Sequence, residues 1–91
     1  FWKRCGDIVR ANDAQMQGII VLGKEAKPEV LAGVFRNARA ESLVKGFAVG
    51  RTIFAGAARD WLNGRIDDDM AVTTMTDLFA RLIDAWDKAG E

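Results

Sequence analysis

Two short apolar runs, separated by a single helical pattern, constrain the fold of this chain most strongly. Residues 18–22 read Gly-Ile-Ile-Val-Leu, a β-branched run that stops at Gly23, and they predict a fully buried strand. Residues 43–49 predict a second buried strand. A helix is expected between them from Pro28, and its apolar stripe is Val30, Leu31, Val34, Phe35 and Ala38. This order predicts parallel strands with a right-handed crossover.

Helical patterns are also expected before and after this unit. Residues 2–11 carry a weak pattern, and residues 53–62 carry an amphipathic one that Asn63-Gly64 ends. The final helix follows Asp67-Asp68-Asp69, three carboxylates that the helix dipole favours at an N-terminus. Its apolar face consists of Val72, Met75, Phe79, Leu82, Ile83 and Trp86. The expected order is therefore helix, strand, helix, strand, helix, helix.

Two parallel strands do not make a complete sheet. Strands of this kind need cover on both faces and neighbours on both edges, so the rest of a longer chain or another copy is expected to supply them. The Phe1-Trp2 start predicts that the chain begins partway through a longer protein. We expect an α/β fold in which residues 1–91 are one partial domain, the C-terminal part of a (β/α)₈ barrel, which needs about 250 residues in full. In this fold the helix after the last strand is a short phosphate helix.

The composition excludes several classes of function. Thirteen basic and thirteen acidic residues leave a net charge of zero, which gives no reason to expect nucleic acid or a membrane surface as a partner. The longest apolar run, residues 19–22, is too short to span a bilayer. The chain has no histidine, so neither a histidine base nor a metal site is expected, and we expect no cofactor. The single Cys5 allows no internal disulfide and fits a cytoplasmic location.

A candidate anion site lies where the second strand meets the following helix. Gly50, Arg51 and Thr52 would present backbone N–H groups at a helix N-terminus, where phosphate groups often bind. Arg51 would add a bidentate contact, and Thr52 would cap the helix or donate its hydroxyl. Gly23, after the first strand, would let the backbone approach a ligand closely. In (β/α)₈ barrels this corner, after strands seven and eight, frequently binds phosphate. The alternative is a tight turn followed by a solvated arginine.

Other charged residues have two interpretations each. Lys45 lies in an apolar strand and is either a Schiff-base lysine or, as we favour, a residue at the amino end of the strand, away from the catalytic face. Lys24 and Glu25 are accessory site candidates or a solvated pair. The aspartates at 67–69 are better explained by helix capping than by a metal cluster. Trp61 and Trp86 are interpreted as packing residues, and Cys5 as a small buried residue.

Three segments resemble a known bacterial family: residues 18–23 (Gly-Ile-Ile-Val-Leu-Gly), 43–54 (Leu-Val-Lys-Gly-Phe-Ala-Val-Gly-Arg-Thr-Ile-Phe) and 61–67 (Trp-Leu-Asn-Gly-Arg-Ile-Asp). They resemble the C-terminal end of the aldolase-like DUF2090-type domain that is fused to 5-dehydro-2-deoxygluconokinase in myo-inositol catabolism. That domain is similar to class I aldolases of the tagatose-bisphosphate type, which carry a related Cys-Gly-Arg segment at the phosphate site after strand eight.

The resemblance implies an activity for the parent protein. It would cleave 6-phospho-5-dehydro-2-deoxygluconate to dihydroxyacetone phosphate and malonate semialdehyde through a lysine imine. The imine lysine would lie on an earlier strand, before Phe1, so residues 1–91 alone would bind the phosphorylated sugar acid without turnover. The alternatives are a non-catalytic binding or oligomerisation domain attached to the sugar kinase, and a different phosphate-handling barrel.

Overall fold

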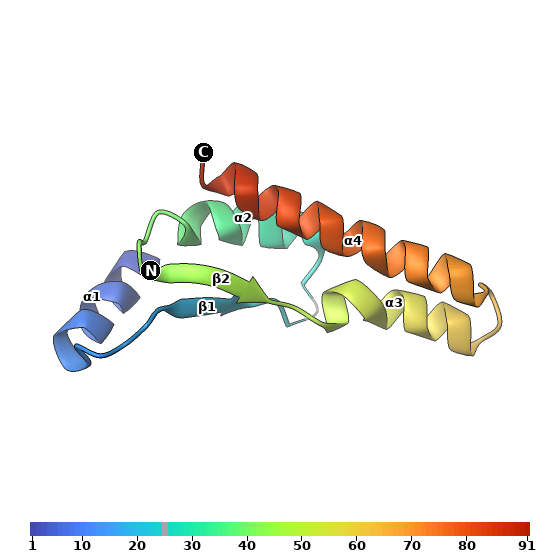
Figure 1. Cartoon of the computed structure of the whole chain (residues 1–91), viewed down its shortest axis with the longest axis horizontal. Helices are drawn as coiled ribbons and strands as arrows, with labels where there is room; N and C mark the ends of the chain where they lie inside the picture. The colour runs from blue at the N-terminus through green and yellow to red at the C-terminus, as the bar shows by residue number, and fades with distance from the viewer. Residues whose placement is uncertain (25) are drawn as a thin grey trace.

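The computed structural model describes residues 1–24 and 26–91. Its elements follow the order helix, strand, helix, strand, helix, helix (Figure 1). They are α1 (Trp2–Asn12), β1 (Ile19–Leu22), α2 (Pro28–Ala38), β2 (Val44–Ala48), α3 (Arg51–Leu62) and α4 (Asp68–Ala89). No helix within the described residues is both long and apolar enough to cross a membrane.

The two strands pair in parallel, and their register contains one irregularity. Ile19 lies opposite Val44, but the next residue of β1, Ile20, lies opposite Gly46, so Lys45 is the extra residue of a bulge in β2. The bulge places Val44 and Phe47, three positions apart, in the same apolar cluster beneath the helices. Lys45 itself is exposed near the amino end of the strand, which is the position that we favoured for it.

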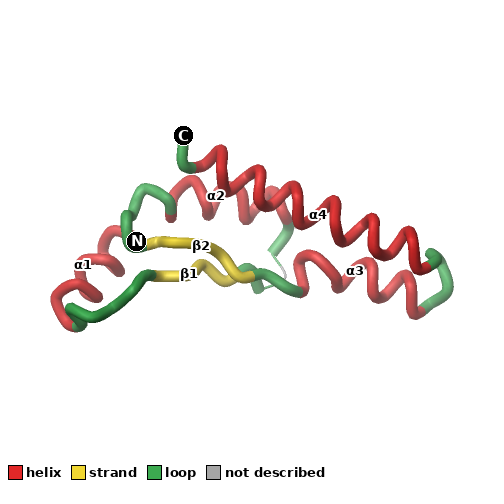
Figure 2. The backbone as a smooth tube through the Cα atoms, in the orientation of Figure 1, coloured by secondary structure: helices red, strands yellow, loops and turns green. Residues whose placement is uncertain are grey.

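One face of the sheet is covered by helices. Helix α2 crosses the sheet from β1 to β2, and the C-terminal half of α4 packs on α2 (Figures 1 and 2). Phe35 of α2 is fully buried and touches Phe47 and Trp86, with ring centroids 4.8 Å and 5.4 Å away. Leu31 and Leu82 are also fully buried in this cluster. Trp86 is thus a core residue, as its helical spacing predicts.

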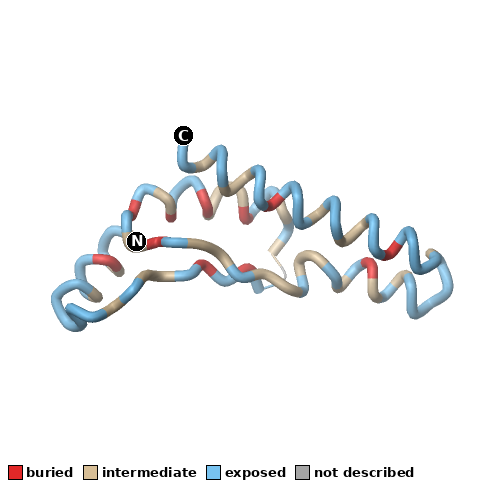
Figure 3. The backbone as a smooth tube through the Cα atoms, in the orientation of Figure 1, coloured by how far each residue is buried: buried red, intermediate tan, exposed pale blue. Residues whose placement is uncertain are grey.

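The opposite face of the sheet is open, which corrects the expectation of a fully buried first strand. Only Val21 of β1 is buried, whereas Ile20 and Leu22 are 59% and 64% exposed (Figure 3). The alternation of side chains along a strand directs Val21 to the helices and its two neighbours away from them. A continuous apolar run predicts cover on both faces, but these residues supply cover for one face only.

Helices α3 and α4 form a hairpin that projects beyond the carboxyl ends of the strands (Figure 1). The molecule is therefore elongated, 51 × 25 × 18 Å, and its radius of gyration of 15.9 Å exceeds the value of about 12 Å for a compact domain of this length. Helix α3 has 12 residues and begins two residues before the expected span of 53–62, and it is short beside the 22-residue α4 that closes the chain. The predicted apolar face of α4 is only partly buried. Leu82 is buried, whereas Val72, Phe79 and Ile83 are exposed.

Candidate functional site

A basic depression lies at the carboxyl ends of the two strands, where α2 and α3 begin. Its volume is about 440 Å³, and its walls come from the loop before α2 and from the first two turns of α3. The lining residues are Ala26, Lys27, Pro28, Arg51, Thr52, Ala55, Gly56 and Arg59. The topology explains this meeting, because each helix of a parallel βαβα unit starts at the same edge of the sheet.

The electrostatics of the depression favour an anion. Lys27, Arg51 and Arg59 all line it and are exposed, and no acidic side chain is among its described lining residues. Lys27 is the N-cap of α2 and Gly50 is the N-cap of α3, so the positive ends of two helix dipoles point toward the same space. Arginine and backbone N–H groups in this arrangement suit phosphate or carboxylate oxygens.

Thr52 joins the two walls of the depression. Its hydroxyl donates a hydrogen bond of 2.7 Å to the backbone carbonyl of Ala26 in the loop before α2. The helix itself has no side-chain cap, so the expectation that Thr52 caps α3 is wrong. The hydroxyl proton is already used in the structure. Thr52 therefore positions Arg51 relative to the loop and offers a ligand at most the lone pairs of its oxygen.

The two glycines of the predicted site have roles in packing. A Cβ on the buried Gly23 would overlap the side chain of Val49, so the close approach at this position is made by Val49. Gly50 has φ −136°, which other residues also adopt, and a Cβ there would lie 3.0 Å from the Phe54 ring. Both glycines bring the ends of β1 and β2 close to their neighbours. Gly23 and Gly50 are not among the residues that line the depression, whereas Arg51 and Thr52 are.

The accessory lysines lie in different places. Lys24 is exposed after β1 and has φ 53°, a left-handed conformation that is uncommon for a residue other than glycine. Glu25 lies outside the described residues. Lys45 is at the other end of the sheet, so it takes no part in the depression.

The aspartates at the start of α4 have different contacts. The Asp67 carboxylate accepts a hydrogen bond of 2.8 Å from the backbone N–H of Met70, and Asp68 accepts one of 2.7 Å from the Trp61 indole. No group of three potential ligands that could hold a metal ion occurs in the described parts of the chain. Helix capping, the interpretation that we favoured, is confirmed for Asp67.

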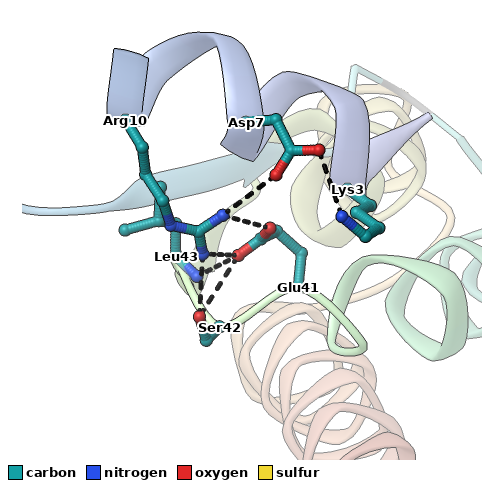
Figure 4. Close-up of polar contacts among 6 residues, drawn as sticks. All are labelled: Lys3, Asp7, Arg10, Glu41, Ser42 and Leu43. Carbon is teal, nitrogen blue, oxygen red and sulfur yellow. Dashed lines mark hydrogen bonds and ion pairs between the residues drawn. The ribbon is translucent and has the colours of Figure 1, made fainter.

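A second polar cluster lies at the amino end of the sheet (Figure 4). Arg10 of α1 donates two hydrogen bonds, of 3.0 and 2.6 Å, to the carboxylate of Glu41, and the N–H of Leu43 donates another of 2.6 Å. The hydrogen bonds from Arg10 and Leu43 lower the pKa of Glu41 to about 2. An adjacent depression of about 620 Å³ is larger than the basic one. However, its charged side chains Lys3, Arg10 and Glu41 all form ion pairs within the chain, so this end is structural.

Lys27 and Arg59 were not among the site residues predicted from the sequence. Arg59 follows Arg51 by eight residues, a spacing that puts both on one face of a helix. Lys27 precedes the expected helix start at Pro28, and the predicted parallel strands imply that α2 and α3 start at the same edge of the sheet. The parallel pairing of β1 and β2 confirms this arrangement, so signals for both residues were present in the sequence.

Comparison with known protein families identifies the family of this chain. A family described as "Uncharacterized protein conserved in bacteria (DUF2090)" matches residues 1–90. No curated protein and no solved structure matches the chain.

Proposed function

We propose that this chain, which belongs to the bacterial DUF2090 family, forms the phosphate-binding end of an aldolase-like (β/α)₈ barrel. The observation that carries the proposal is the basic depression, in which Lys27, Arg51 and Arg59 meet two helix N-termini at the carboxyl ends of parallel strands. Barrel enzymes place their active sites at this edge of the sheet, with phosphate after the last strands.

The open face of the sheet supports the barrel part of the proposal. Ile20 and Leu22 of β1 are exposed, and Gly46 and Ala48 of β2 lie opposite them in the register. In a barrel the face away from the helices becomes the interior, which is filled by such side chains from successive strands. Six further strands would cover this face and both free strand edges.

The proposed substrate is a phosphorylated sugar acid. Its phosphate would bind in the basic depression, with Arg51 as a paired donor and Thr52 holding the loop in place. In the whole barrel, a lysine on another strand would form an imine with the substrate ketone and accept the electrons when the carbon–carbon bond breaks. The reaction that we propose is cleavage of 6-phospho-5-dehydro-2-deoxygluconate to dihydroxyacetone phosphate and malonate semialdehyde, in a protein fused to the corresponding sugar kinase.

Titration of dihydroxyacetone phosphate into the protein, followed by amide chemical shifts, tests the binding site. We expect shifts at the starts of α2 and α3, and a loss of affinity of about tenfold or more for Arg51→Ala, because hydrogen bonds to charged groups contribute about 1.5–3 kcal/mol. Arg36→Ala is the matched control, since Arg36 is exposed on α2 and does not line the depression. Equal affinities for both variants would refute the phosphate site.

Borohydride reduction of the full-length protein with its phosphorylated substrate tests the chemistry. A lysine adduct with the mass of the reduced imine supports the aldolase. Binding without an adduct would instead favour the second candidate, a non-catalytic binding domain attached to the kinase. The basic depression alone fits both candidates, because it would bind phosphate whether or not a lysine attacks the ketone.

A further inference from the structure

The projecting hairpin of α3 and α4 carries an apolar surface that no described part of the chain covers. We call it the hairpin face. Its members are Phe54, Ala58, Trp61, Val72, Met75, Phe79 and Ile83. Trp61 is 48% and Val72 59% exposed, which is unusual for large apolar side chains so close together. Between them runs a groove of about 350 Å³, lined by Ala58, Trp61, Asp68, Ala71, Val72 and Met75.

The fold explains why this surface is left open. Helix α4 packs on α2 and α3 with the side that carries the buried Ala71 and Leu82. Val72, Phe79 and Ile83 lie about a quarter of a turn further round the helix, on an adjoining side. The hairpin also projects past the carboxyl ends of β1 and β2 (Figure 1), so strands that extend this sheet sideways would not reach it.

The charges of the two helices are complementary. Helix α3 contains two arginines and one aspartate, a net charge of +1. The part of α4 beside α3, residues 68–77, contains Asp68, Asp69 and Asp77 and no basic residue, a net charge of −3. A second hairpin would therefore be attracted when its α3 lies against α4 of the first, and repelled when like helices face each other. The zero net charge of the whole chain offers little repulsion between copies.

We propose that two copies of this chain associate through the hairpin face, with α3 of each copy against α4 of the other. A two-fold axis parallel to the helices produces this pairing and forms a four-helix bundle with the apolar groove in its core. Each α3 then runs antiparallel to the α4 that it meets. The inference does not depend on phosphate binding, because the hairpin face is separate from the basic depression except for the helix that they share.

The same geometry predicts a contact at the edge of the interface. Asp69 lies one turn before Val72 on α4, and Leu62 lies one turn after Ala58 and next to Trp61 on α3, so each is at the rim of the hairpin face on its helix. Both side chains are exposed. In the proposed dimer, Leu62 of one copy approaches Asp69 of the other. The alternative two-fold axis, across the helices, would place α3 against α3 and α4 against α4.

Light scattering during gel filtration tests the surface. We expect the protein to be a dimer and Val72→Asp to raise the dimer dissociation constant at least tenfold, because the carboxylate would be buried in an apolar groove. Val30→Asp, at a side chain that is 56% exposed on α2 and lies outside the hairpin face, is the control and should leave the dimer intact. A monomeric protein, or a dimer that Val30→Asp disrupts and Val72→Asp does not, would overturn the proposal.

Cross-linking tests the arrangement without depending on how Val72→Asp folds. In a Cys5→Ser background, Leu62→Cys and Asp69→Cys are made as separate proteins and mixed with a short bis-maleimide. We expect a covalent dimer in the mixture and much less in either protein alone. Cross-linking of either single-cysteine protein with itself, at the same yield as the mixture, would show that like helices face each other and would reject the proposed axis.

Discussion

Arg10 and Glu41, 31 residues apart in the sequence, form a two-point ion pair that fastens α1 to the loop before β2. Glu41 is only 5% exposed, although it is charged, and its carboxylate also accepts the N–H of Leu43. Buried carboxylates in proteins are retained where every oxygen has a partner. No buried side-chain nitrogen or oxygen within the described residues lacks a hydrogen bond. The pair therefore holds α1 by satisfying Glu41, which would otherwise destabilise the loop.

This pair predicts a loss of stability in acid. The pKa of Glu41 is about 2 in the folded protein, below its ordinary value of 4.5, so the unfolded chain takes up the proton more readily. The contribution is complete above pH 4.5 and is lost as the pH falls from about 4.5 to 2. In thermal unfolding at a series of pH values, Glu41→Gln should show a smaller fall in Tm across this window than the unchanged protein. Asp77→Asn, on the exposed surface of α4, is the control, and equal slopes for Glu41→Gln and the unchanged protein would contradict the prediction.

Replacement of Gly6 by alanine should destabilise the protein, unlike most Gly→Ala substitutions within helices. In a helix interior, Gly→Ala ordinarily stabilises by about 0.5–1 kcal/mol. A Cβ at the buried Gly6 of α1, however, would overlap the carboxylate of Glu41, so Gly6→Ala should destabilise by about 1–3 kcal/mol, the range for overpacked sites. Gly33→Ala in α2 is the control, because its Cβ meets only the end of the Arg36 side chain at 3.6 Å. Urea unfolding should move the two midpoints in opposite directions, and a stabilised Gly6→Ala would show that the Glu41 contact gives way easily.

The helices and strands could be predicted from the sequence, because the residues that start and end them lie within or beside them. Pro28 starts α2, the Asn63-Gly64 pair follows the end of α3, and Asp67 caps α4. The expected and observed strands differ by one residue at each end of β2. Apolar periodicity and capping depend on residues that are close together in the sequence, so the starts, ends and apolar faces of the helices can be predicted from it.

Features that depend on the meeting of distant segments could not be predicted. The bulge at Lys45 depends on how β2 fits β1 and the helices, and the exposure of Ile20 depends on what covers the sheet. Helical periodicity likewise showed which residues of α4 are apolar, but not that Val72 and Leu82 would have opposite burial. In the candidate site, Arg51 was predicted from its motif. The predicted parallel strands imply that α2 and α3 start at the same edge of the sheet, but they do not show that Lys27 and Arg51 line one depression.

The hydrogen bond from Thr52 to Ala26 should contribute both to the free energy of unfolding and to anion binding in the basic depression. Thr52→Val keeps the side-chain shape but removes the hydroxyl that donates to Ala26 at 2.7 Å. We expect a loss of about 1 kcal/mol in the free energy of unfolding, the usual net value of one hydrogen bond, together with weaker anion binding because the loop before α2 is released. Thr52→Ser, which retains the hydroxyl, should keep both properties near those of the unchanged protein. Equal behaviour of the valine and serine variants would mean that the hydrogen bond contributes little.

Phe35 carries the largest predicted effect on stability. It is fully buried, and its ring packs against both Phe47 of the sheet and Trp86 of α4, so it joins three elements of the core. Phe35→Ala should cost about 3–5 kcal/mol, which is comparable with the whole stability of a chain of this length at its lower end, about 5 kcal/mol. Urea unfolding followed by tryptophan fluorescence measures the loss. Phe35→Leu, closer in volume, should cost less, and Val30→Ala, at a side chain that is 56% exposed on the same helix, should change stability by about 0.5 kcal/mol at most. A Phe35→Ala protein as stable as Val30→Ala would show that α4 is held to the sheet by contacts other than this aromatic cluster.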